Sequence, residues 1–505
     1  MNNYDIFIIG GGINGCGVAR DAAGRGYSVY LCESGDLASG TSSQSTKLIH
    51  GGLRYLEYYE FRLVHEALTE REILWKIAPH IIHPLRFILP HHKDLRPAWL
   101  LRLGLFLYDH IGGRKKLPAT TTLDLKTDQA GEPLSQNYKK GFEYSDCAVD
   151  DARLVILNAL DAAERGASIN TRSKCIKMQT KEGLWNLTVE DQISKKQTGI
   201  TAKVLINASG PWADEVLATL NPSTKVKNIR LVQGSHIIVP KIYKHKKCYI
   251  FQNRDNRIIF AIPYQDNFTL IGTTDHEYQG DPRKTHITKE EIDYLCESAN
   301  GYFKHKITAK DIVGTFSGVR SLYNDGASKA QEATRDYVLR VDRANPRAAP
   351  IINIFGGKIT TYRRLAETVL EKIEGLIKKN SEKNKGKWTQ TSHLPGGNFE
   401  IDDFTQICKQ LHKDYPFLSE EEAHRYIKLY GTRARDFLEN AKSYQDLGES
   451  FGHGLYQSEV EYQIHTEWAR TVEDILWRRT KLGLLFRQSQ IKQLEKWLEE
   501  HARTM

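Results

Sequence analysis

A glycine-rich turn near the start of the chain has the spacing of a dinucleotide-binding site. Gly10, Gly12 and Gly15 satisfy the pattern G-x-G-x-x-G, with Asn14 inside it. The turn follows an apolar run at residues 6–9 and opens a helical pattern. Glycines at these places allow a tight turn and let a pyrophosphate approach the positive end of a helix. The pattern therefore predicts a strand, turn and helix that bind FAD or NAD.

Two later segments extend this unit. Glu33 ends the next apolar strand, near the spacing of a carboxylate that hydrogen-bonds a ribose hydroxyl. A second strand-like run at residues 203–207 ends in Ala208 and Gly210, which indicates that a distant part of the chain returns to the same sheet. We expect Glu33, Ala208 and Gly210 to contact the cofactor.

Residues 38–56 are rich in hydroxyl groups and then punctuated by glycine. Hydroxyls can contact phosphates, and bare backbone at a glycine pair lets a flat ring lie against the chain. Histidine needs the least adjustment of its pKa to act as a base near neutral pH, so His50 is our first candidate. The segment also supplies candidate cofactor contacts and candidate substrate contacts: Thr41, Ser42, Lys47, Gly51 and Gly52 for the first, Arg54 and Tyr55 for the second.

A third glycine turn follows an apolar run at residues 351–355 and precedes a helical pattern. Gly357, Lys358 and Thr360 place backbone donors, a cation and a hydroxyl at a helix start, where developing negative charge on a flavin would be stabilised. Lys358 could also reach a substrate phosphate. The polar stretch at 378–387 predicts a linker before a helical C-terminal region.

Long strings in the sequence resemble the bacterial aerobic, FAD-dependent glycerol-3-phosphate dehydrogenases. They include GGGING, KLIHGGLRYLE, GSHIIVP, GTTD, SGVR, TRDY and FGGK, and the likeness runs from Asp5 to near Arg479. The resemblance implies an α/β + α fold with a discontinuous Rossmann-like FAD-binding domain of the glutathione-reductase and D-amino-acid-oxidase type. We expect this domain at 1–75, 150–230 and 311–380, an antiparallel-sheet substrate domain at 76–149 and 231–310, and a helical domain at 388–505.

The resemblance also implies an activity. Hydride would pass from C2 of sn-glycerol 3-phosphate to N5 of non-covalent FAD, giving dihydroxyacetone phosphate, and electrons would continue to a membrane quinone. Arg320 and Arg335 would clamp the substrate phosphate, because planar guanidinium groups bind phosphate through two hydrogen bonds. His236 is the second candidate for the base, and Thr274 with Asp275 would line the substrate cavity.

Alternatives remain for the acceptor and the substrate. An oxidase that passes electrons to oxygen belongs to the same class. A flavin oxidase of an amine such as glycine would share both glycine turns, but it would not need two arginine motifs. A nucleic-acid or membrane-surface protein would use the net charge of +9, but no zinc spacing or aromatic RNA signature supports it.

The N-terminal residues, the cysteines and one basic, apolar segment indicate where in the cell the protein acts. The N-terminal residues lack the pattern of a signal peptide and the seven cysteines form no CxxC pair, so we expect a cytoplasmic protein without disulfides or a metal site. The segment 95–117 combines apolar and basic residues and could lie on the anionic inner leaflet. We therefore expect a peripheral membrane protein that contacts anionic lipid, forms a homo-oligomer (a dimer) and binds no nucleic acid.

Overall fold

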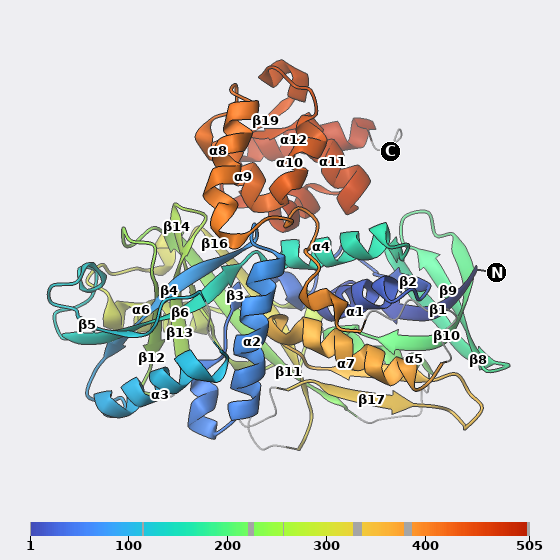
Figure 1. The fold of residues 1–505 in the computed structure, drawn as a ribbon, viewed down its shortest axis with the longest axis horizontal. Helices are drawn as coiled ribbons and strands as arrows, with labels where there is room; N and C mark the ends of the chain where they lie inside the picture. Colours follow the sequence, from blue (N-terminus) through green and yellow to red (C-terminus); the bar gives the residue numbers. More distant parts are fainter. Residues whose placement is uncertain are drawn as a thin grey trace.

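Two large sheets lie side by side, and a helical domain sits on one edge of the pair (Figure 1). The computed structural model describes residues 2–113, 116–220, 227–255, 257–326, 336–377 and 386–501. The chain passes between the two sheets several times before it enters the helical domain.

The first sheet is mainly parallel and carries the N-terminal glycine turn. In spatial order its strands are β17 (Val338–Asp342), β18 (Ile351–Phe355), β10 (Gln197–Asn207), β1 (Asn2–Ile9), β2 (Val29–Cys32) and β7 (Ser168–Asn170), with β9 (Leu184–Asp191) and β8 (Ser173–Lys181) attached to β10. β1 pairs in parallel with both β2 and β10, and β10 in parallel with β18. Ile6, Phe7 and Ile8 are all 0 % exposed, because helices or strands cover both faces.

Helices from three distant regions cover this sheet. α1 (Ile13–Gly24) packs against α4 (Asp151–Glu164) and α7 (Tyr362–Glu374), while α5 (Ala213–Leu220) follows β10. The Asp150 side chain caps α4 by accepting a hydrogen bond from the Arg153 amide. The predicted strands at 203–207 and 351–355 are confirmed as β10 and β18, so the nucleotide-binding domain is discontinuous.

The second sheet is mainly antiparallel. Its strands are β15 (His276–Glu277), β11 (Ile229–Pro240), β14 (Phe268–Gly272), β13 (Ile258–Tyr264), β12 (Cys248–Gln252), β4 (Ile82–His91), β6 (Lys140–Val149) and β3 (Leu48–Ile49), with β16 (Gly314–Tyr323) on β11 and β5 (Thr121–Asp124) on β6. α2 (Phe61–Ile77), α3 (Ala98–Ile111) and α6 (Lys289–Tyr302) surround it, and Thr288 and Glu291 form a capping box at α6.

Two strands lie elsewhere than we expected. Residues 48–49, which we assigned to the nucleotide-binding domain, form β3 and pair with β6 of the second sheet. Residues 314–323, assigned to the same domain, form β16 and pair along their length with β11 of the second sheet. The chain joins the first sheet only with β17 and β18. The physical reason is the long antiparallel register between β16 and β11, which carries Arg320 toward the interface of the two sheets.

The C-terminal domain is helical, as predicted, with one small hairpin. It contains α8 (Phe404–Asp414), α9 (Glu420–Tyr430), α10 (Ala434–Leu438), the hairpin β19 (Ser450–Gly452) and β20 (Leu455–Tyr456), α11 (Gln457–Glu467), a π-helical turn at Asp474–Arg479 and α12 (Gln488–His501). Most of the predicted linker lies outside the described residues. Beyond it, the Trp388 ring contacts the guanidinium groups of Arg20 and Arg165. No described helix has the length and apolar composition needed to cross a bilayer.

Candidate active site

A cavity of about 2010 Å³ lies between the two sheets and collects most of the residues that the sequence predicted. The predicted residues that line it are Gly10, Gly12, Asn14, Glu33, Thr41, Ser42, His50, Gly52, Arg54, Tyr55, Ala208, Gly210, His236, Asp275, Arg320, Gly357, Lys358 and Thr360. Gly15, Lys47, Gly51 and Thr274 lie behind the wall, and Arg335 lies outside the described residues.

The N-terminal glycine turn is as tight as its sequence indicates. Gly10 has φ +113°, and a Cβ there would lie 2.5 Å from the carbonyl oxygen of Ala208. A Cβ on Gly15 would lie 1.9 Å from the carbonyl oxygen of Gly10. The carboxylate of Glu33 accepts hydrogen bonds from the amides of Gly11 (2.7 Å) and Gly35 (2.8 Å), which joins the turn to the next loop. Only glycine fits these positions.

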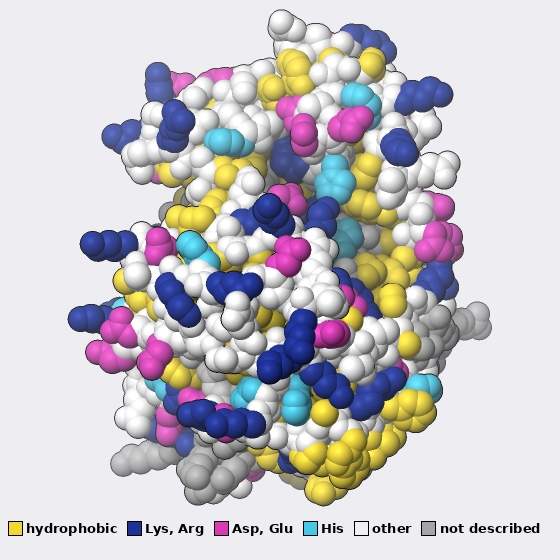
Figure 2. Space-filling view, turned by 90° about the vertical axis from the view of Figure 1, so that its left-hand side faces the viewer, with side chains coloured by type: hydrophobic (Ala, Val, Ile, Leu, Met, Phe, Trp, Pro, Cys, Tyr) yellow, Lys and Arg dark blue, Asp and Glu magenta, His cyan; other side chains and the backbone are white. Residues whose placement is uncertain are grey.

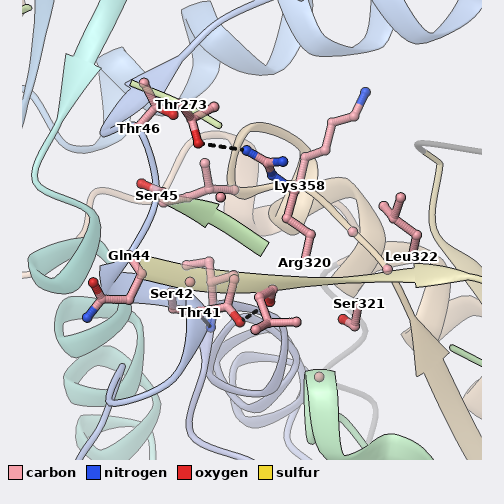
Figure 3. A pocket seen from close by; sticks show the side chains of 18 of the residues that line it. Thr41, Ser42, Gln44, Ser45, Thr46, Thr273, Arg320, Ser321, Leu322 and Lys358 are labelled. Atoms are coloured by element: carbon pink, nitrogen blue, oxygen red, sulfur yellow. Dashed lines mark hydrogen bonds between the residues drawn. The ribbon is translucent and has the colours of Figure 1, made fainter. Parts of the chain in front are cut away.

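The hydroxyl-rich segment braces this turn. Ser42 Oγ accepts from the Ile13 amide at 3.0 Å, and Thr41 Oγ1 donates to the Val319 carbonyl at 2.6 Å (Figure 3). Lys47 does not face the cavity. Its ammonium donates to the Asp151 carboxylate at 2.9 Å and to the Ser43 carbonyl at 2.9 Å, so it holds the segment from behind.

The third glycine turn lies directly beside the N-terminal one. Gly356 and Gly357 have φ +74° and +100°, and Asn14 Nδ2 donates to the Gly356 carbonyl at 3.1 Å. The Asn14 Oδ1 atom is buried and has no hydrogen-bond partner among the described residues. Lys358 follows the turn and places its ammonium 3.9 Å from the ring centre of Tyr55. A cation, a polar atom without a partner and bare backbone thus meet on one wall.

Arg320 reaches the cavity from β16 and is held by the loop after β14. Its Nη1 donates to Asp275 at 3.0 Å and its Nη2 donates to Thr273 Oγ1 at 3.3 Å (Figure 3). Thr274 points the other way: its hydroxyl accepts from the Ser235 amide and donates to Glu291, so it is a structural residue. We predicted that Thr274 lines the cavity, but Thr273 lines it instead. Neighbouring side chains in an extended chain point to opposite sides, so only one of the two threonines can face the cavity.

His50 lies on the cavity wall with a defined ring orientation. The Gly52 amide donates to His50 Nδ1 at 3.1 Å, so in the neutral ring the proton sits on Nε2. Burial lowers the pKa of His50 below its ordinary value, and Lys358 and Arg71 lower it further while Asp146 opposes them. His50 is therefore neutral at neutral pH.

His236 is more enclosed. It is 1 % exposed, its ring stacks on Phe316 at 4.6 Å, and its Nε2 lies 3.1 Å from Thr46 Oγ1. Burial lowers the pKa of His236 well below its ordinary value, and the charges of Lys47 and Arg320 act in the same direction. Of the two predicted histidines, His50 is the more open to the cavity.

Sequence reasoning missed several wall residues. Gln44, Thr46, Thr273, Trp212 and Phe260 all line the cavity. The Oε1 atom of Gln44 is buried without a hydrogen-bond partner in the described chain. Gln44 and Thr46 stand beside the predicted hydroxyls, and this adjacency was the signal that could have identified them.

The wall fits a bound FAD. The glycine turn leaves room for a pyrophosphate, and Glu33 directly follows β2. Buried oxygen atoms of Asn14 and Gln44 have no hydrogen-bond partner among the described residues, so a bound cofactor could supply one. No described group of three or more histidine, cysteine or carboxylate side chains could hold a metal ion.

Comparisons with known proteins agree with this geometry. Residues 5–343 match the family "FAD dependent oxidoreductase", and residues 387–505 match "C-terminal domain of alpha-glycerophosphate oxidase". The chain is 50% identical to a glycerol-3-phosphate dehydrogenase of Pseudomonas aeruginosa over 99% of this chain and 96% of the other. It is 48% identical to a D-erythritol 1-phosphate dehydrogenase of Brucella abortus over 98% and 97%.

Solved structures extend the likeness to three dimensions. A glycerol-3-phosphate dehydrogenase of Bacillus halodurans complexed with FAD covers 99% of this chain and 90% of its own, with a TM-score of 0.78 and 28% identity. A glycine oxidase of Geobacillus kaustophilus, at 16% identity and a TM-score of 0.51, shares the fold alone. The chain therefore belongs to the FAD-dependent oxidoreductases, with FAD as its cofactor, and this explains the glycine turn, the second sheet and the helical domain together.

Proposed function

We propose that the chain oxidises the C2 hydroxyl of sn-glycerol 3-phosphate to the ketone of dihydroxyacetone phosphate, with FAD as hydride acceptor. The observation that carries the proposal is the position of Arg320. It reaches the same cavity as His50 and Lys358, so an anion-binding group and a histidine face one space beside the glycine turns. Relatives 47–50% identical that are named glycerol-3-phosphate dehydrogenases support this substrate.

The phosphate would be held by cations from three elements. Arg320 is oriented by Asp275 and Thr273, and Lys358 is placed against Tyr55. Arg54 lies on the same wall, where its guanidinium donates to the Tyr58 hydroxyl at 3.0 Å. A guanidinium fixed in this way loses little freedom when it binds phosphate. Arg335 is the fourth cation that we propose from the resemblance.

His50 is the group that would handle the proton of the C2 hydroxyl. FAD bound in this site would accept the hydride. Because the pKa of His50 is lowered, the ring is neutral and available to take up a proton as hydride leaves. Nε2 carries the ring proton while Nδ1 accepts from Gly52, so the Gly52 bond must open before the ring takes up the substrate proton. Nδ1 can then accept directly, or Nε2 can accept once the ring proton has moved to Nδ1. His236 contacts the Thr46 hydroxyl and would assist this proton transfer from behind Thr46.

Anaerobic mixing of the purified protein with sn-glycerol 3-phosphate tests the proposal. Loss of the visible flavin absorbance is expected with this substrate, and none with unphosphorylated glycerol, because the clamp needs the phosphate. Bleaching by glycine in place of glycerol 3-phosphate would overturn the proposal in favour of an amine oxidase.

A second substrate has its own support. The relative named D-erythritol 1-phosphate dehydrogenase is 48% identical over almost the whole chain, and a phosphate clamp alone does not distinguish two polyol phosphates. The ratio of kcat/KM for the two compounds decides between them, because this ratio measures preference at the transition state. We expect it to favour glycerol 3-phosphate.

We also propose peripheral binding to the cytoplasmic face of the membrane through an apolar surface around α3. Its exposed side chains are Tyr58, Tyr59, Phe61, Trp99, Leu103, Phe106 and Leu107. The face turned toward the viewer in Figure 2 shows hydrophobic side chains gathered at its lower edge. Arg62 and Arg96 lie beside the surface, where they pair with Asp336 and Glu57 but keep exposed side chains that could also contact anionic lipid. Membrane quinone is the proposed electron acceptor, and the homodimer stays a prediction.

Flotation with liposomes tests the surface. Wild-type protein should float with vesicles that contain anionic lipid, and Trp99→Glu with Leu103→Glu should remain at the bottom while FAD stays bound. Equal flotation of both proteins would remove α3 from the contact.

A further inference from the structure

Residues 474–481 of the C-terminal domain run against two loops that line the cofactor cavity. This segment ends in the sequence Arg478-Arg479-Thr480-Lys481, whose three cations are all buried. The C-terminal domain lies along the edge of both sheets in Figure 1, and these cations are among its contacts with the first sheet.

Two of the cations bind one carboxylate in the loop after β2. Asp36 is 3 % exposed and accepts from Arg478 Nε at 2.6 Å and from Arg479 at 2.5 and 2.8 Å. Asp36 directly follows Glu33, Ser34 and Gly35, which line the cavity, but does not line it itself. Two guanidinium groups on one carboxylate fix the end of the loop that carries Glu33.

The same segment also holds a neighbouring loop. Asp474 accepts from Arg172 Nη2 at 2.5 Å, and the Arg172 amide donates to the Gly35 carbonyl at 2.8 Å. The next amide, of Ser173, donates to the Glu33 carbonyl at 2.7 Å. Ser173 lines the cavity, so both loops at this end are tied to the C-terminal domain.

The third cation reaches the hydroxyl-rich segment. Lys481 Nζ lies 3.4 Å from Asp151 and 3.5 Å from Asp150. Asp151 also accepts from Ser45 Oγ at 2.8 Å and from Lys47 at 2.9 Å. Ser45 and the next residue, Thr46, line the cavity.

We infer that Arg478, Arg479 and Lys481 are positioning residues of the FAD site, and that the C-terminal domain thereby sets how tightly FAD is held. None of the three lines the cavity, so they act through Asp36 and Asp151. A bound group is held well only when the residues that support its contacts are themselves fixed. This role in FAD retention does not depend on which substrate the protein oxidises.

The interface offers a matched control. Arg153 of α4 donates to Glu467 of α11, and both side chains are 0 % exposed, but neither residue lines the cavity. Asp36→Asn and Glu467→Gln each remove one buried carboxylate charge that faces arginine across this interface. Both should destabilise the fold, because each leaves a buried cation without its counter-charge.

The experiment follows the release of FAD from diluted holoenzyme by the rise of free-flavin fluorescence. We expect Asp36→Asn to release FAD about 10-fold faster than wild type, as loss of a supporting partner commonly weakens a bound group. Glu467→Gln should release it at the wild-type rate, although both variants unfold at a lower temperature. Equal release rates for the two variants would overturn the inference.

A second substitution covers the case in which Asp36→Asn does not fold. Lys481→Met keeps an unbranched side chain that is one atom shorter and leaves Lys47 to pair with Asp151. It should also speed FAD release and change the shape of the visible flavin band, because the segment around Ser45 loosens. Lys481→Met holoenzyme with the wild-type release rate and spectrum would contradict the role of Lys481.

Discussion

Side chains in the cavity owe their roles to partners that are distant in the sequence. Lys47 stands in a hydroxyl-rich run and was predicted to bind the cofactor, yet Asp151 lies 104 positions away and takes its charge. The sequence identifies residue types, but only the fold shows which cation is already neutralised. Arg320, predicted from the resemblance that the string SGVR carries, does line the cavity.

Replacement of Arg320 tests the phosphate clamp. Arg320→Ala should raise KM for glycerol 3-phosphate by roughly 10- to 100-fold, since a hydrogen bond to a charged group contributes about 1.5–3 kcal/mol. FAD content should not change. Arg343→Ala, at an exposed position, is the control in the same steady-state assay. An unchanged KM would exclude Arg320 from the clamp.

The pH profile tests His50. A base works when deprotonated, so kcat/KM should fall as pH drops through the pKa of His50. That midpoint should lie below the ordinary histidine value of about 6.5, because burial lowers this pKa. His50→Gln should lower kcat and remove the acidic limb, whereas His305→Gln, at an exposed site, should keep it. A variant that retains the limb would move the assignment to His236.

At the scale of elements, the helices and the parallel strands followed from apolar periodicity and glycine turns. The position of β16 did not, because a strand pattern does not say which sheet a strand joins. α3 shows the same limit. Its apolar pattern was evident from the sequence. The sequence did not show that the Gly51 amide donates to the Tyr108 hydroxyl (2.7 Å), a hydrogen bond that links this helix directly to the loop that carries His50.

Tyr108→Phe tests that link. The Tyr108 hydroxyl also donates to Asp146 at 2.8 Å, so its loss leaves two buried groups short of a partner and should lower the free energy of unfolding by about 1–3 kcal/mol. We expect kcat to fall while KM and FAD content stay the same. Tyr249→Phe removes a buried hydroxyl that bonds Ala130 elsewhere and serves as the control. If both variants lose kcat equally, the link has no role in positioning.

Over the whole molecule, buried ion pairs join the domains, and they make stability depend on pH. Although burial raises the pKa of Asp151, Lys47 and Lys481 outweigh it and hold that pKa at about 2. Because the pKa is lower in the folded state, the stabilisation is complete above about pH 4 and is lost as pH falls toward 2. It amounts to roughly 2 kcal/mol.

Acid unfolding measures this contribution. Lys481→Met should shift the midpoint of unfolding to higher pH, because the carboxylate loses one of its two cations. Lys496→Met, whose cation pairs with Glu500 on the exposed side of α12, should leave the midpoint in place. A midpoint that moves equally in both would assign the effect to net charge.

The order in which the chain visits the two sheets has a consequence for synthesis. β1 reaches its full set of neighbours only when β10 is made, and β10 is completed only by β18, which ends at Phe355. At about 5–20 residues per second, a ribosome takes on the order of tens of seconds to deliver that strand. Until then the growing chain exposes unpaired strand edges of both sheets, which are prone to aggregate. Such a nascent chain is a natural client for chaperones, and slower translation near β18 should lower the yield of soluble protein.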